Sequence, residues 1–150
     1  MSNALAEAGA HVAIIYRSGK AAGESTAAHL AQAHSIKSIA YQADVADLGS
    51  ITLAMKQIVR EFGRLDIVVA NAGIGTEVDA IDMSANVMRE TMAVNLEGAF
   101  YTAQAAAKVF KAQGSGNIIF TTSMSASIVN RPEPQAAVSP RLTPGITYAN

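Results

Sequence analysis

Residues 65–75 read LDIVVANAGIG, a short apolar run rich in β-branched side chains that leads into a turn of small residues. Such a run is typical of a strand buried on both faces, as strands of parallel sheets are. The small residues that follow it, Asn71, Ala72 and Gly73, allow a ligand to approach the backbone closely. Taken alone, the pattern fits an ordinary strand-to-loop turn equally well.

Strands and helices alternate on either side of this stretch. We expect further strands at residues 11–16, 37–41 and 116–121, and helices at residues 2–8, 20–33, 48–62 and 84–113, the last with a bend near 95–98. The helix over 48–62 is the clearest, because its apolar residues recur at helical spacing between Asp47 as N-cap and Gly63. The alternation predicts an α/β fold with a doubly wound parallel sheet, which binds ligands beyond the carboxyl ends of its strands.

The composition is that of a globular domain with a buried interior. Half of the 150 residues are hydrophobic, 15% are charged, and the formal net charge of −1 favours neither nucleic acid nor an anionic membrane as a partner. The absence of cysteine excludes disulfides and thiolate chemistry, and the three histidines lack ligand spacing, so no metal site is expected. With no signal peptide and no apolar run of membrane length, we expect a cytoplasmic protein.

Four short motifs stand at or inside the expected elements, and together they resemble the short-chain dehydrogenase/reductase family over residues 2–137. They are Asp44-Val45, Asn71-Ala72-Gly73, Val94-Asn95-Leu96 and Thr122-Ser123-Met124-Ser125. The resemblance implies a Rossmann-type fold and hydride transfer between a nicotinamide cofactor and a carbonyl or alcohol. Each motif also has an ordinary explanation: Asp44 as a turn residue, Asn95 as a response to a helix irregularity, and Ser123 as one residue of a Ser/Thr-rich run.

The resemblance implies roles for individual residues at the cofactor. Asp44 would accept a hydrogen bond from the adenine amino group, and Val45 would pack against the adenine ring. The turn formed by Asn71, Ala72 and Gly73 would line the cofactor.

The same resemblance implies a catalytic relay. Asn95 would hold a water through its backbone carbonyl, at a local bend in the helix. Ser123 would hydrogen-bond the substrate oxygen, and we prefer it to Ser125 because it lies directly at the strand end.

The end of the 11–16 strand bears on cofactor choice. Rossmann proteins that use NAD place a carboxylate there for the ribose 2′-hydroxyl, whereas this strand continues into Arg17 and Ser18. A guanidinium pairs bidentately with a phosphate, so NADP(H) is favoured over NAD(H). The alternative is that Arg17 is only a solvated surface charge.

Two features of the family are absent from the sequence. No glycine-rich phosphate-binding turn precedes residues 2–8, and no Tyr-x-x-x-Lys follows Ser123 at the usual distance. Either residues 138–147 are an insertion and Tyr148 begins that motif, which we favour, or Tyr148 is coincidental. We therefore expect an incomplete sheet that lacks its first and C-terminal strands, and a chain that is truncated at both ends, poorly stable and inactive on its own.

The expected organisation is a partial dinucleotide-binding domain over residues 1–130 and an irregular, proline-rich tail over 131–150. Residues 123–135 look most like NADP-dependent polyol and ketose reductases of the mannitol dehydrogenase or sorbose/xylulose reductase type. The expected partner is a small carbonyl or alcohol substrate, and the intact family member is expected to be a homo-oligomer. The alternative function is a non-catalytic fragment that pairs with full-length relatives.

Overall fold

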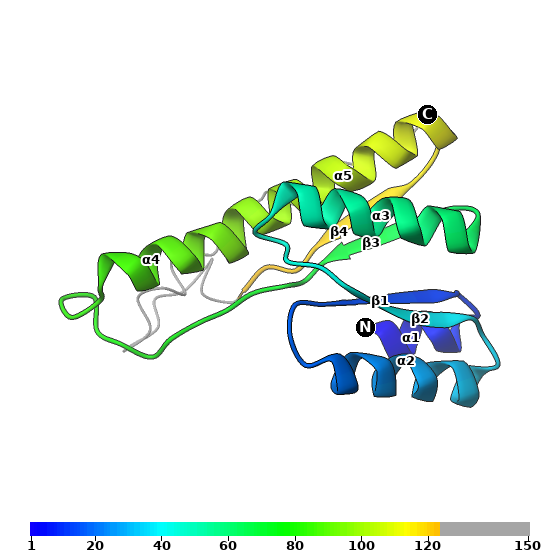
Figure 1. Cartoon of the computed structure of the whole chain (residues 1–150), viewed down its shortest axis with the longest axis horizontal. Coiled ribbons are helices and arrows are strands. Elements are labelled where there is room, and N and C mark those ends of the chain that lie inside the picture. Colours follow the sequence, from blue (N-terminus) through cyan, green and yellow to red (C-terminus); the bar gives the residue numbers. More distant parts are fainter. Residues whose placement is uncertain (124–150) are drawn as a thin grey trace. The chain divides into compact units, whose positions relative to one another are not determined.

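The computed structural model describes residues 1–123, and Figure 1 shows the expected alternation of helices and strands. The elements are α1 (Ser2–Glu7), β1 (Val12–Tyr16), α2 (Lys20–His34), β2 (Ser38–Gln42), α3 (Leu48–Phe62), β3 (Ile67–Ala70), α4 (Ala85–Met92), the π-helical segment η1 (Ala93–Glu97), α5 (Gly98–Gln113) and β4 (Asn117–Phe120). The predicted order is confirmed, and the bend predicted near 95–98 is the π-helical segment. None of the helices within residues 1–123 is long and apolar enough to cross a membrane.

The chain forms two compact units, which are described separately. The first unit contains Met1–Asp44 and Gly49–Arg64, and the second contains Val45–Leu48 and the chain from Leu65 onward. The predicted tail, residues 131–150, lies outside the described residues.

The first unit is built on a parallel pair of strands, β1 and β2, in register from Val12 opposite Ser38 to Tyr16 opposite Gln42. Figure 1 shows α1 and α2 on the same side of this pair. Ala6 of α1, Val12 of β1 and Leu30 of α2 form its apolar core. Alternate strand residues therefore face these two helices, as the period of two in a strand requires.

The second unit is built on another parallel pair, β3 and β4, in register from Ile67 opposite Asn117 to Ala70 opposite Phe120. Val68 and Ala70 are buried on one face of the pair, whereas Ile67 and Ile119 on the other face are 40% and 47% exposed. The helical stretch α4–η1–α5 runs on almost without interruption, and α5 packs against both strands.

Within residues 1–123 each strand has a single hydrogen-bonded neighbour, so β1–β2 and β3–β4 are two separate two-stranded sheets. The α/β class and the parallel pairing predicted from the sequence are confirmed. The two separate sheets are in line with the expectation of an incomplete sheet.

Candidate cofactor and catalytic site

The carboxyl ends of β1 and β2 are joined by two hydrogen bonds just before the predicted cofactor residues. The Ala43 N–H donates to the Tyr16 carbonyl at 2.9 Å, and Gln42 Nε2 donates to the Arg17 carbonyl at 3.1 Å. Arg17 and Ser18 are exposed. The backbone at Arg17 is thus held beside the end of β2, while its side chain and that of Ser18 reach solvent.

Arg17 and Ser18 lead directly into the amino terminus of α2. Gly19 is the N-cap with a left-handed backbone (φ 78°), and the first turn of α2 contains no acidic residue. The amino end of a 15-residue helix carries unpaired N–H groups and a partial positive charge. A guanidinium, a hydroxyl and a helix amino terminus form a donor set that fits a phosphate group.

A close contact between Tyr16 and Gly23 holds the last residue of β1 against α2. A Cβ atom placed on Gly23 would lie 2.6 Å from Tyr16 Cδ1, which is too close for any side chain. The aromatic ring therefore occupies the space that a side chain at Gly23 would need. This packing anchors the strand end from which Arg17 continues.

The β2–α3 connection carries Asp44 and Val45, and the boundary between the two units passes between them. The Asp44 N–H donates to Ser50 Oγ at 3.0 Å, which ties Asp44 to the first turn of α3. Val45 lies in the second unit, where its side chain packs against Gly98 at the start of α5. Both residues are half-buried.

Asn95 lies in the π-helical segment and clamps the backbone that follows the Asn71-Ala72-Gly73 turn. Its Oδ1 accepts from the Ile74 N–H at 2.8 Å, and its Nδ2 donates to the Ile74 carbonyl at 2.9 Å. A Cβ atom on Gly73 would lie 3.5 Å from Asn95 Oδ1, an ordinary contact. The amide side chain thus fixes the turn to the helix, and segments of π-helix are frequent at functional sites.

Ser123 follows β4 at the same edge of the sheet as the Asn71 turn. The two parallel strands end together, because the Thr121 N–H donates to the Ala70 carbonyl at 3.1 Å. Ser123 is half-buried, and Asn71 is exposed. In the second unit, the small-residue turn after β3 thus lies at the same strand ends as Ser123 and is bonded to Asn95 through Ile74.

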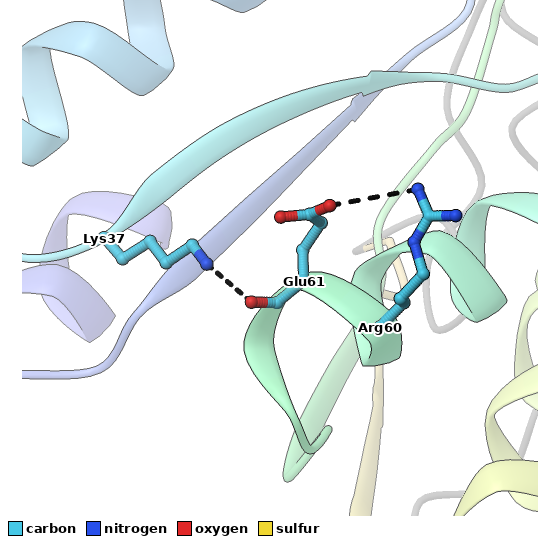
Figure 2. A network of polar contacts seen from close by, with 3 residues as sticks. All are labelled: Lys37, Arg60 and Glu61. Atoms are coloured by element: carbon cyan, nitrogen blue, oxygen red, sulfur yellow. Dashed lines mark hydrogen bonds and ion pairs between the residues drawn. The ribbon is translucent and has the colours of Figure 1, made fainter.

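A polar cluster at the other end of the first unit joins β2 to α3 (Figure 2). Lys37 Nζ donates to the Glu61 carbonyl at 2.5 Å and lies 4.9 Å from the centroid of the Phe62 ring. An ammonium group at the carboxyl end of a helix stabilises its unpaired carbonyls. The adjacent ion pair of Arg60 and Glu61, at 3.9 Å and largely exposed, contributes little.

Tyr41 of β2 lies near the same cluster. Burial of its hydroxyl, with a smaller contribution from the Glu61 carboxylate, raises the pKa of Tyr41 above its usual value, and Arg60 opposes this shift. Within residues 1–123 the buried Tyr41 Oη has no hydrogen-bond partner. This cluster supports the unit structurally.

Comparison with known proteins agrees with this geometry. The family model described as short chain dehydrogenase matches residues 1–135. The chain belongs to the short-chain dehydrogenase/reductase family. Its fold is accordingly the incomplete Rossmann-type, doubly wound α/β fold that the sequence predicts.

The similar proteins include reductases of sugars and other ketones. A sorbose reductase of Schizosaccharomyces pombe is 38% identical over 139 residues, which are 91% of this chain and 54% of that protein. An L-xylulose reductase of Hypocrea jecorina is 40% identical, over 87% of this chain and 51% of that protein. The crystal structure of an NADPH-dependent 3-quinuclidinone reductase from Rhodotorula rubra is 41% identical, with a TM-score of 0.83, over 92% of this chain and 53% of that one. The chain thus spans about half the length of the curated relatives it matches.

The structure sorts the predicted site residues by unit. Arg17, Ser18 and Asp44 lie in the first unit, and Val45, Asn71, Ala72, Gly73, Asn95 and Ser123 lie in the second. Tyr148, and Ser125 as the competitor of Ser123, lie outside the described residues. In residues 1–123 no three histidine, aspartate or glutamate side chains gather as a metal ion would require.

Three residues with a part in the site were not identified from the sequence: Gln42, Ile74 and Gly98. Gln42 and Ile74 act through long-range hydrogen bonds with the backbone, which leave no local pattern. Gly98 could have been noticed in the sequence, because a glycine inside a helical stretch usually has a packing or functional reason.

Proposed function

We propose that this chain is part of an NADP(H)-dependent oxidoreductase that interconverts a carbonyl and an alcohol on a polyol or ketose. The observation that carries the proposal is the donor set at the end of β1, where Arg17 and Ser18 enter the amino terminus of α2 and no carboxylate follows the strand. The polyol and ketose class comes from the names of the relatives, which include NADP-dependent mannitol dehydrogenases.

The residues would divide the cofactor between them. Arg17 and Ser18 would hold a ribose 2′-phosphate, because a guanidinium and a hydroxyl beside a helix amino terminus favour a dianion. Asp44 and Val45 would hold the adenine, and the turn from Asn71 to Gly73 would lie against the rest of the cofactor. When bound, the nicotinamide supplies the hydride acceptor or donor.

The remaining residues would handle the substrate oxygen and its proton. Ser123 would donate a hydrogen bond to the substrate carbonyl from the end of β4. Asn95, whose side chain is held by Ile74, would present its backbone carbonyl at the π-helical segment to a water of the proton relay. Tyr148 would be the general acid or base, and it lies outside the described residues.

Three further expectations belong to this proposal. We propose residues 1–130 as the dinucleotide-binding part, a homo-oligomeric state for the intact protein, and a cytoplasmic location. A non-catalytic chain that only binds the cofactor, or pairs with a longer relative, is an alternative outcome of the experiment below.

Calorimetric titration of the chain with NADPH and NADH tests the proposal. NADPH is expected to bind more tightly, by about tenfold or more, since a charge-assisted hydrogen bond contributes about 1.5–3 kcal/mol. Arg17→Ala removes this preference, whereas the control Arg60→Ala, an exposed arginine of the same unit, keeps it. Equal or tighter binding of NADH would contradict the cofactor assignment.

Turnover is measured separately, by following NADPH absorbance with fructose, sorbose or xylulose. We expect no turnover from this chain on its own. Turnover that Ser123→Ala abolishes would support the oxidoreductase and contradict the expected inactivity of the chain.

A further inference from the structure

Gly98, at the start of α5, leaves no room for a side chain beside Val45 of the β2–α3 connection. A Cβ atom on Gly98 would lie 2.8 Å from Val45 Cγ2 and 3.2 Å from Val45 Cβ. Contacts below 3.0 Å do not occur for real Cβ atoms, and Val45 Cβ is attached directly to the backbone. The valine therefore occupies the space in which any side chain at position 98 would stand.

The backbone of Gly98 offers no other reason for a glycine. Its φ of −61° and ψ of −40° are ordinary right-handed helical values that every residue adopts. A glycine inside a helix costs about 1 kcal/mol relative to alanine. Room for Val45 is the explanation that the geometry provides.

Gly98 also closes the π-helical segment that carries Asn95. Its N–H donates to the Ala93 carbonyl, the bond that spans five residues in a π-helix. Gly98 thus contacts two parts of the second unit. One is the turn at Val45 and Ala46, and the other is the π-helical segment, whose Asn95 is hydrogen-bonded to Ile74.

We infer that Gly98 is a positioning residue for the adenine end of the cofactor site, acting through Val45. Because Gly98 has no side chain, Val45 packs directly against the start of α5. This contact positions the turn that follows Asp44. The inference rests on the proposed function, in which Asp44 and Val45 hold the adenine.

The first arm of the test measures thermal unfolding of four chains: wild type, Gly98→Ala, Val45→Ala and the double variant. In the wild type, Gly98→Ala lowers the melting temperature by several degrees, because the added methyl group overpacks against Val45. In the Val45→Ala background the same change lowers the melting temperature much less, because the 2.8 Å approach to Cγ2 is gone and only the 3.2 Å approach to the Cβ atom of residue 45 remains against the helix preference for alanine. An equal loss in both backgrounds overturns the inference.

Gly75→Ala is the matched control for this arm. A Cβ atom on Gly75 meets nothing within 4 Å, and its backbone is not left-handed. The melting temperature of this variant is expected to stay within about a degree of the wild type in both backgrounds, since open exposed positions have small effects.

The second arm measures binding of 2′,5′-ADP, which carries the adenosine end alone, by calorimetry. Gly98→Ala is expected to weaken binding at least fivefold, and the double variant is expected to return to the affinity of Val45→Ala. Wild-type binding with no change in Gly98→Ala overturns the inference and leaves the proposed function standing. No binding by the wild type overturns the proposed adenine site, and the inference falls with it.

Discussion

The two strand pairs of this chain are alike in topology but differ in how their strands are anchored. In the first unit, β1 and β2 are stabilised by apolar packing of Val12 against Ala6 and Leu30. In the second unit, Val68 and Ala70 of β3 are buried as well, but Ile67 is 40% exposed and side-chain amides hold both flanks of the strand. The first half thus relies on apolar packing, whereas the second adds directed amide contacts to it.

Two amide side chains of one helical stretch hold the two flanks of β3. Gln113, at the end of α5, accepts from the Leu65 N–H at 3.1 Å and donates to the Leu65 carbonyl at 2.9 Å, just before the strand. Asn95 makes the same pair of bonds with Ile74 after the strand. Apolar burial is non-directional, whereas a two-point amide contact fixes orientation. The half with the proposed catalytic residues has the more directional support.

The largest loss of stability is expected from a substitution in the apolar core of the first unit. Leu30→Ala removes a side chain that is 2% exposed and should lower the free energy of unfolding by about 3 kcal/mol. Chemical denaturation measures this change, with Leu53→Ala on α3, a leucine 58% exposed, as a control that should change little.

Hydrogen exchange in the Leu30→Ala variant shows whether the two strand pairs unfold independently. Protection should fall most at the amides of β1, which pack against Leu30, and least at those of β3. Equal loss of protection in both strand pairs would show that they unfold as one, and that the difference between them has no energetic consequence.

The next largest loss of stability is expected from removal of an amide contact in the second unit. Asn95→Leu leaves the Ile74 N–H and carbonyl without this partner and should cost about 2 kcal/mol. Asn86→Leu on α4 is the control, since Asn86 only accepts from the exposed Arg89 side chain. If the two variants lose equal stability by chemical denaturation, the Asn95 contact does not support the second unit.

Much of the fold could be predicted because its signals are local. The bounds of α3, Leu48–Phe62, are predictable to the residue, since apolar spacing and a following glycine mark them. The bend near Asn95 is predictable as an irregularity, but its π-helical form is not. Ile67 reads as buried in an apolar run, yet it is 40% exposed, since burial depends on which neighbours cover a strand.

The candidate site could be predicted where residues follow strand ends, as Arg17, Asn71 and Ser123 do. Gln42 and Gly98 could not be placed in the site, because their partners, the Arg17 carbonyl and the Val45 side chain, are distant in sequence. Such contacts depend on strand register and helix docking, which a single sequence does not specify.

A smaller effect concerns the cofactor end of the first unit. Gln42→Leu removes the hydrogen bond to the Arg17 carbonyl and should weaken NADPH binding about fivefold, as one hydrogen bond of about 1 kcal/mol implies. NADH binding should change less, because the 2′-phosphate is the group that Arg17 would hold. Gln57→Leu, an exposed glutamine of α3, serves as the control. An equal loss for both cofactors by calorimetry would show that Gln42 does not act through Arg17.

The smallest effect is on alkaline stability. Burial raises the pKa of Tyr41, so the unfolded chain loses this proton first as the pH rises. The stabilisation is complete below about pH 10, the ordinary tyrosine pKa, and is lost as the pH rises through the folded value. Tyr41→Phe should therefore flatten the alkaline fall in stability without lowering stability at pH 7, because the hydroxyl has no hydrogen bond to lose within residues 1–123.

Tyr101 of the second unit provides the comparison for this measurement. The Glu97 carboxylate beside it raises the pKa of Tyr101, but this side chain is solvent-exposed. Tyr101→Phe should flatten the alkaline curve less than Tyr41→Phe does. The reverse order in pH-dependent denaturation would mean that burial of Tyr41 is not the larger cause.

The proposed binding of the 2′-phosphate by the first unit is tested most directly by mapping amide chemical shifts while the chain is titrated with 2′,5′-ADP. We expect the largest shifts at Arg17 and Ser18 and at the amino terminus of α2, with a further shift at Val45. The amides of Leu65 and Gln113 should remain unchanged. If the amides of Arg17 and Ser18 stay unshifted at saturating ligand, these residues do not hold the 2′-phosphate.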